Sequence, residues 1–233
     1  MSHLFYGVAY YDEYMPEDRL AKDIALMRET GINVVRIAES TWSTLEPEEG
    51  QYNFYHIDRV LEAMHEAGIA VIVGTPTYAV PAWLAAKHPD ILVTTVAGQQ
   101  KDGPRQIMDI VNPTFRRYAE KIIRTLMAHV QHHPAIIGWQ LDNETKHYDN
   151  IGRYMQEGFV RSLQEKYPDL RQLNHDFGLD YWSNRIDRWQ DFPPVENTIN
   201  ASLACAFSRY QRQQVTEYLA WQAAIVREYA QPH

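Results

Sequence analysis

The sequence has little of several features that mark other classes of protein. Its 233 residues include one cysteine, Cys205, which excludes an intramolecular disulfide framework and a cysteine-based zinc site. The net charge is −8 and no Lys/Arg-rich run occurs, so nucleic acid and anionic membranes are poor partners. No stretch reaches the roughly 20 apolar residues that span a bilayer. The first residues lack the basic segment and cleavage site of a signal peptide, and we therefore predict a soluble, cytoplasmic protein.

Aromatic residues are what the sequence has in excess. They make up 12% of the chain, with 15 Tyr and 6 Trp. Aromatic side chains bury well in any core, and their faces also stack on the apolar faces of sugar rings. Composition alone leaves both interpretations open.

Apolar runs and helical patterns alternate along the first 141 residues. Continuous apolar strands separated by helices are typical of a parallel sheet covered by helices. Gly31 and Gly68 each stand where a helix is expected to end. We predict no fifth strand and expect the stretch from Pro168 to the last helix to form a loop. The predicted strands are 5–10, 33–38, 69–74 and 135–141, and the predicted helices are 19–29, 57–67, 81–85, 113–129, 151–167 and 203–229.

The carboxyl ends of the predicted strands are polar and aromatic, whereas the strand interiors are apolar. Active residues of parallel α/β folds collect at these ends. The pattern therefore predicts an enzyme of the (β/α) type. The four segments are Tyr10–Glu13, Glu39–Trp42, Thr75–Tyr78 and Asp142–Glu144.

Glu144 is the leading candidate for catalysis. Burial at the end of an apolar strand raises the pKa of a carboxyl group, which suits a general acid. Asn143 beside it can hydrogen-bond a substrate hydroxyl. The alternative is that Glu144 caps a helix or pairs with an arginine. Arg36 lies inside a predicted strand, where its charge requires a carboxylate partner.

The segment Trp139–Glu144 resembles the acid/base segment of glycoside hydrolase family 42, the β-galactosidases. This resemblance covers nearly the whole chain and implies a (β/α)₈ TIM barrel, of which residues 1–233 hold the first four βα units, the N-terminal half of the catalytic domain. It also implies a retaining β-galactosidase that acts on β-galactosides, needs no cofactor and forms homotrimers. Further matching segments are 5–11, 35–43, 45–50, 74–77 and 81–84.

The resemblance assigns a role to individual residues. Glu144 corresponds to the proton donor, and Asn143, Arg105 and Trp182 correspond to sugar contacts. The alternatives are a solvated loop arginine for Arg105 and loop packing for Trp182. Three further residues are candidates to line the cleft: Arg36, Glu39 and Trp42. The alternative for Arg36 is a structural ion pair, and the alternative for Glu39 and Trp42 is loop packing.

A retaining mechanism needs a second carboxylate, about 5–5.5 Å from the first. In this family the nucleophilic glutamate follows a later strand, which lies beyond this chain. We therefore expect the 233 residues alone to be inactive. The other interpretations are a non-catalytic carbohydrate-binding remnant and a hydrolase of the same superfamily with another sugar specificity.

No metal site is expected. Some members of the family bind zinc through cysteines in the loops after Arg105 and Glu144, where this sequence has Asp109 and 145–149 without cysteine. His129, His132 and His133 fit a solvated helix end, where a positive charge suits the helix dipole.

Overall fold

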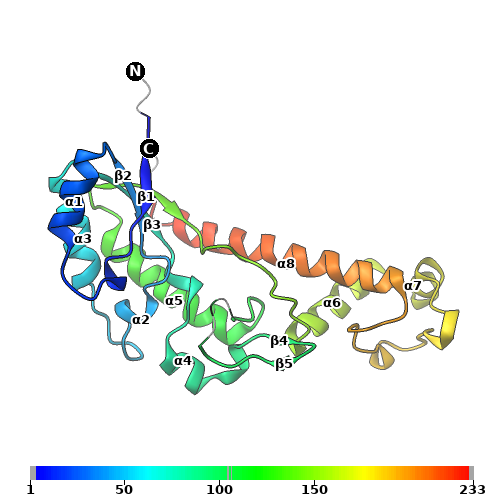
Figure 1. Cartoon of the computed structure of the whole chain (residues 1–233). Coiled ribbons are helices and arrows are strands. Elements are labelled where there is room, and N and C mark those ends of the chain that lie inside the picture. Colours follow the sequence, from blue (N-terminus) through cyan, green and yellow to red (C-terminus); the bar gives the residue numbers. More distant parts are fainter. Residues whose placement is uncertain (1–3, 104, 106, 231–233) are drawn as a thin grey trace. The chain divides into compact units, whose positions relative to one another are not determined.

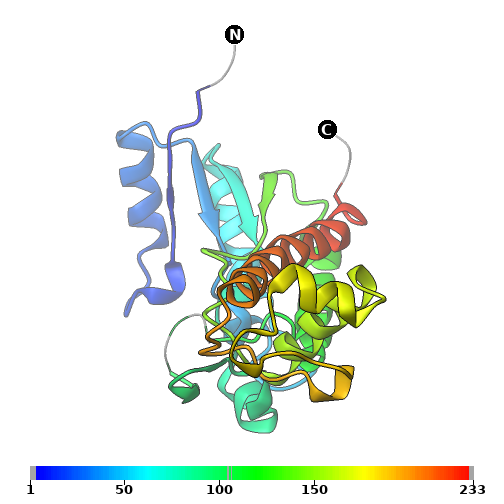
Figure 2. The same cartoon turned by 90° about the vertical axis from the view of Figure 1, so that its right-hand side faces the viewer.

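The computed structural model describes residues 4–103, 105 and 107–230 (Figures 1 and 2). The chain divides into two compact units. The sheet unit consists of Met1–Pro89, Arg117–Thr145 and Leu219–His233. The helical unit consists of Asp90–Arg116 and Lys146–Tyr218.

Four parallel strands form the main sheet of the sheet unit. Val35 pairs with Val8 on one side and with Val71 on the other, so one register runs through the first three strands. The strand order follows the chain, and all neighbours pair in parallel, which confirms the predicted parallel sheet of four strands. The strands are β1 (Gly7–Ala9), β2 (Val34–Ile37), β3 (Ala70–Gly74) and β6 (Ile136–Gln140).

Helices connect these strands because parallel neighbours need a crossover. On α3, Ile57, Val60, Leu61 and Met64 are buried, the spacing of one helix face. Gly68 follows this helix at φ 70°, a left-handed conformation that glycine adopts without strain, as the sequence predicts. The crossover helices are α1 (Leu20–Glu29), α3 (Tyr55–Glu66) and α5 (Pro113–Val130), and the loops after β2 and β3 add α2 (Trp42–Leu45) and α4 (Ala82–Lys87).

The inner and outer strands of the sheet differ in burial. Val35 of β2 and Val71 and Val73 of β3 are buried, whereas all three residues of β1 are exposed. Strand β6, at the opposite edge, is buried only at Ile136. The two edge strands therefore have the solvent contact that is expected where a sheet ends.

The helical unit has its own core between three helices (Figure 1). They are α6 (Arg153–Lys166), α7 (Leu170–Phe177) and α8 (Ala201–Arg227), of which α8 continues into residues of the sheet unit. A short antiparallel hairpin, β4 (Thr94–Thr95) with β5 (Gly98–Gln99), also belongs to this unit. The core includes Met155, Phe159, Leu163, Leu173, Leu179, Ile186, Leu203 and Phe207.

Helix α7 and the hairpin lie in stretches that the sequence did not predict to be ordered. The Asp169 carboxylate accepts a hydrogen bond from the Arg171 backbone N–H at 2.9 Å and caps the start of α7. Each hairpin strand has two residues, too few for an alternating pattern to show.

Helix α8 buries a continuous stripe that includes three glutamines. A stripe of apolar residues is expected there, yet Gln211, Gln214 and Gln222 lie in it. The buried positions of this stripe are Leu203, Phe207, Gln211, Gln214, Tyr218, Gln222 and Ile225, three or four residues apart.

Within the described ranges, no helix has the length and hydropathy needed to cross a membrane.

Candidate active site after strand β6

The turn after β6 has a strained backbone. Asp142 and Glu144 have φ angles of 51° and 46°, in the left-handed region that costs energy for residues other than glycine. Such strain persists only where the surroundings hold it, and it clusters at functional sites. Between the two strained residues stands Asn143.

The side chain of Asn143 has a fixed orientation. Gln140 Nε2 donates to the Asn143 Oδ1 atom at 3.2 Å and to the Asp142 carbonyl at 2.6 Å. The carbonyl oxygen of the Asn143 side chain is thereby occupied, and among the described residues none accepts a hydrogen bond from its NH₂ group. This group is therefore suited to donate to a hydroxyl of a ligand.

Glu144 is exposed, which corrects the expectation that its carboxyl group is desolvated. The reason is its position beyond an edge strand, of which only the first residue is buried. The Tyr78 hydroxyl donates to Glu144 Oε2 at a long 3.4 Å. Glu144 thus contacts a residue from the loop after β3 and is open to solvent.

The buried carboxylate of this turn belongs to Asp142. Asp142 is 1% exposed. Burial raises the pKa of Asp142, and hydrogen bonds from Thr145 and Thr77 oppose that shift. The Thr77 hydroxyl donates to Oδ1 at 2.9 Å and the Thr145 hydroxyl to Oδ2 at 2.6 Å. We had not predicted a role for Asp142, because two of its partners, Thr75 and Thr77, are 67 and 65 positions away in the sequence.

Arg36 has the carboxylate partner that the sequence predicts. Its Nη2 atom donates to Glu39 Oε1 at 2.8 Å and to the Tyr11 hydroxyl at 2.9 Å, and Tyr11 in turn donates to the same Glu39 oxygen at 2.6 Å. Burial raises the pKa of Tyr11, and its hydrogen bond to Glu39 adds to the shift. Tyr11, which we had not selected, is therefore part of this cluster.

The Arg36–Glu39 pair keeps unused hydrogen-bonding capacity. Arg36 Nε and Glu39 Oε2 are buried and have no hydrogen-bond partner among the described residues. The position of Glu39 depends on Gly74, because a Cβ atom at residue 74 would lie 2.7 Å from the Glu39 Cβ atom. One donor and one acceptor thus remain for a further group.

Trp42 lies in the packed interior. It is 0% exposed, and its Nε1 atom donates to Glu46 Oε2 at 2.9 Å. Glu39 is also buried, at 1%. The position of Trp42 agrees with the loop-packing alternative, and the structure gives its ring no open face.

Arg105 and Trp182 belong to the helical unit, whereas the other candidates belong to the sheet unit. Arg105 is exposed, and its neighbours Pro104 and Gln106 lie outside the described residues. Trp182 is 70% exposed, has a φ of 54°, and its ring meets that of Tyr181 edge-on at 6.0 Å. An exposed indole held in a left-handed conformation is available for stacking.

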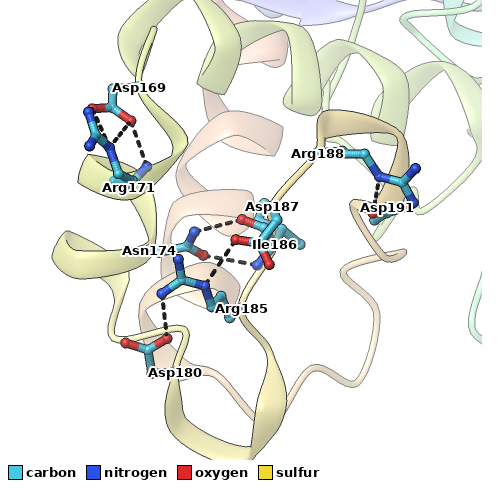
Figure 3. A network of polar contacts seen from close by, with 9 residues as sticks. All are labelled: Asp169, Arg171, Asn174, Asp180, Arg185, Ile186, Asp187, Arg188 and Asp191. Carbon is cyan, nitrogen blue, oxygen red and sulfur yellow. Dashed lines mark hydrogen bonds and ion pairs between the residues drawn. The ribbon is translucent and has the colours of Figure 1, made fainter.

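A buried asparagine fixes the loop that follows Trp182 (Figure 3). Asn174 Nδ2 donates to the Ile186 carbonyl at 2.6 Å, and the Ile186 N–H donates to Asn174 Oδ1 at 3.0 Å. Ion pairs surround this contact on the surface: Asp169–Arg171, Asp180–Arg185, Asp187–Arg185 and Asp191–Arg188.

The loops after Arg105 and Glu144 contain a hydrogen-bond network. Asn150 Nδ2 donates to Asp109 Oδ1 at 2.7 Å, and the Val111 N–H donates to the same oxygen at 3.0 Å. Burial raises the pKa of Asp109 to about 6. Within the described ranges, no three His, Cys, Asp or Glu residues form a group that could hold a metal ion. His129 contacts Asp58 Oδ1 at 2.6 Å.

A parallel sheet with a carboxylate and an amide just past the end of a strand fits the (β/α) class of enzymes. The family model of glycoside hydrolase family 42, described as β-galactosidase, matches residues 9–233. The chain belongs to this family.

Named relatives agree with this membership. The β-galactosidase BgaA of Clostridium cellulovorans is 33% identical over 226 residues, and BgaH of Haloferax lucentense is 31% identical over 229 residues. Each alignment covers 95% of this chain and 34% of the relative, so the chain spans about a third of the length of the curated relatives it matches.

A solved structure establishes the fold class. The β-galactosidase of Marinomonas ef1 superposes with a TM-score of 0.91 at 31% identity, over 97% of this chain and 36% of the other. The chain is therefore an α/β portion of the TIM-barrel type, with the four parallel strands of its first βα units.

Proposed function

We propose that this chain supplies the acid/base side of a retaining β-galactosidase site. In this proposal Glu144 donates the proton to the leaving-group oxygen and Asn143 binds a hydroxyl of the sugar. The observation that carries it is the strained turn after β6, which presents both side chains beyond the carboxyl end of a parallel strand. Membership of family 42 supports β-galactosides as the substrate class.

The remaining candidates have supporting roles in the proposal. Arg105 and Trp182 contact the sugar, the first through its guanidinium and the second by stacking. Arg36 and Glu39 offer their unpartnered Nε and Oε2 atoms to a group outside the described residues. Residues 1–233 form the N-terminal half of the catalytic barrel, and the nucleophilic carboxylate comes from outside them. Cytoplasmic location and assembly into homotrimers stay predictions of the sequence.

The first test uses the 233-residue chain by itself. We expect it to bind galactose with about millimolar affinity, roughly 4 kcal/mol, and not to hydrolyse a nitrophenyl β-galactoside. Retaining hydrolysis needs a carboxylate opposite the acid to form the glycosyl-enzyme. Turnover that disappears in Glu144→Gln would show that a carboxylate of this chain completes the pair, and would overturn the placement of the nucleophile.

The second test uses a longer enzyme that carries this segment. Glu144→Gln removes the proton donor at nearly constant size, and we expect turnover of an unactivated galactoside to fall by roughly 10²–10⁴-fold. A substrate whose leaving group needs little protonation should lose less, and azide should restore deglycosylation. Unchanged turnover would show that Glu144 is not the acid. Glucosides and mannosides, assayed in parallel, test the sugar specificity.

A further inference from the structure

Beneath the Glu144 turn lies a closed ring of four hydrogen bonds. The Asp142 N–H donates to Thr75 Oγ1 at 2.7 Å, and the Thr75 hydroxyl donates to Gln222 Oε1 at 2.6 Å. Gln222 Nε2 donates to Thr77 Oγ1 at 2.9 Å, and the Thr77 hydroxyl donates to Asp142 Oδ1 at 2.9 Å. The ring thus begins and ends at Asp142, and all of its members belong to the sheet unit.

All four residues of the ring are buried. Thr75 is 2% exposed, Asp142 1%, and Thr77 and Gln222 are 0% exposed. In such surroundings water cannot replace a lost hydrogen bond, so each unpartnered group costs its full desolvation energy. Hydrogen bonds that follow one another in one direction also strengthen each other. The ring therefore holds Asp142 more firmly than separate surface contacts would.

The identity of each group fixes the direction of the ring. The Asp142 N–H can only donate and its ionised carboxylate can only accept. If the Gln222 amide were reversed, both threonine hydroxyls would have to turn. The Thr77 oxygen would then face the carboxylate at 2.9 Å without a proton between them. One orientation of the amide is therefore strongly favoured.

The ring is joined to the two candidate site residues through the backbone. Asp142 is held at both its N–H and its carboxylate, and Thr145, the residue after Glu144, donates to the second carboxylate oxygen. The strained backbone of Asp142 and Glu144 thus lies within a segment fixed at its two ends.

We propose that Asp142 is a positioning residue, and that the ring it forms with Thr75, Thr77 and Gln222 fixes the turn in which Asn143 and Glu144 face the substrate. The inference rests on the proposed function, because it assigns the turn a role in sugar binding. It also gives α8 a role in the site, because Gln222 lies on this helix. In the sequence, most of the helical unit separates Gln222 from Asp142.

The test compares two substitutions of Thr77 in the 233-residue chain. Thr77→Val keeps the shape and removes the hydroxyl, whereas Thr77→Ser keeps the hydroxyl. Galactose is titrated by NMR, and the shifts of the Asn143 and Glu144 amides are followed. We expect Thr77→Val to weaken binding at least about tenfold and Thr77→Ser to bind as the unchanged chain does. Thr125→Val, which removes a hydroxyl that donates to the Lys121 carbonyl of its own helix, is the matched control.

A second variant approaches the ring from the other side. Gln222→Met has similar volume and removes both amide contacts, and it should have the same effect on galactose binding while Thr77 keeps its hydroxyl. Faster hydrogen exchange at the Asp142 N–H should accompany the loss of binding, because that group donates into the ring. Thermal unfolding and circular dichroism establish that each variant is folded, and Gln222→Met decides the question if Thr77→Val does not fold.

The outcomes separate the two proposals. Galactose binding that persists unchanged in folded Thr77→Val or Gln222→Met overturns the positioning role and leaves the proposed function intact. If the unchanged chain shows no galactose-dependent shifts at Asn143 and Glu144, the proposed function fails, and the positioning role fails with it. Loss in Thr77→Val and Gln222→Met, with retention in Thr77→Ser and Thr125→Val, supports both.

Discussion

Two turns that carry candidate sugar-binding residues are held in different ways. The turn after β6 is fixed by a buried ring in which each polar group has a defined partner. The loop after Trp182 is fixed by one buried asparagine, and the charged contacts around it are on the surface (Figure 3). Buried hydrogen bonds have no competing water, whereas surface ion pairs are screened by salt. We therefore expect the number of salt bridges near a site to be a poor guide to its rigidity.

The largest expected effect comes from removing the centre of the ring. Asp142→Ala leaves two hydroxyls without their acceptor and places alanine at a φ of 51°. We expect a loss of roughly 3–4 kcal/mol in the free energy of unfolding, measured by urea denaturation of the chain. Asp142→Asn should cost less, since the amide keeps an oxygen for Thr77 and asparagine tolerates the left-handed region. Equal losses would contradict this account.

The next effect depends on pH and concerns Asp109. Because burial raises its pKa from 3.8 to about 6, the folded chain binds this proton more tightly than the unfolded chain does. Stability associated with the group is fully present below pH 4 and is lost as the pH rises through about 6. The loss amounts to about 3 kcal/mol.

Asp109→Asn removes this pH dependence. The Val111 N–H and Asn150 Nδ2 donate to the same Asp109 oxygen, which an asparagine side chain retains. The variant should match the unchanged chain near pH 4 and exceed its stability near pH 8, as measured by thermal unfolding at the two values. The exposed Asp187→Asn serves as the control. A constant difference across this range would show that the pKa of Asp109 is not raised.

A smaller effect is expected from the asparagine that holds the second loop. Asn174→Ala leaves the buried N–H and carbonyl of Ile186 without partners, at a cost of about 2 kcal/mol. Hydrogen exchange at the Ile186 amide should become faster, whereas exchange at Asp142 should not change. Asn184→Ala, which removes a partly exposed side chain that donates to Tyr181, is the control. Equal exchange at Ile186 in both variants would show that Asn174 does not hold the loop.

The smallest effect is expected from the surface ion pairs. Arg185→Ala removes the contacts to Asp180 and Asp187, which lie 3.3 Å and 3.0 Å from the guanidinium. At physiological salt we expect no resolvable change in the midpoint of thermal unfolding. A loss as large as that of Asn174→Ala would show that surface ion pairs hold this loop as firmly as the buried asparagine does.

Local sequence patterns predict the sheet and most of the helices. The strand at Ala70–Gly74 is a run of apolar and β-branched residues, and Gly31 and Gly68 end their helices as expected. Helix α7 begins at an aspartate cap after Pro168 and has apolar residues at 170, 173 and 177, the spacing of one helix face. The sequence therefore carried a local signal for this helix that our prediction of a loop missed. The signal is short, because the helix has eight residues, and a helix of this length depends on packing against its neighbours.

The sequence predicted where the candidate site residues lie in the fold, but it did not predict how exposed Glu144 is. The motif located Asn143 and Glu144 past the end of a strand, but that strand lies at the edge of the sheet, and Glu144 is exposed as a result. The ring was beyond local reasoning, because Thr77 and Thr75 lie 65 and 67 positions from Asp142. Gln222, which contacts both threonines, lies 80 positions from Asp142 in the sequence. Three glutamines interrupt the apolar stripe of α8, and one of them, Gln222, belongs to the ring.

The fixed order of protons in the ring has a consequence for proton movement. A chain of hydroxyls relays a proton when each member can turn over and pass on what it receives. In this ring one terminus is the Asp142 backbone amide, which does not release its proton. The Gln222 side-chain amide between the two threonines does not release its protons either. The ring therefore cannot relay a proton from one end to the other. The ring therefore offers no route for the proton that Glu144 is proposed to donate. The structure that holds the turn still is, by the same hydrogen bonds, insulated from the proton transfer proposed to take place above it.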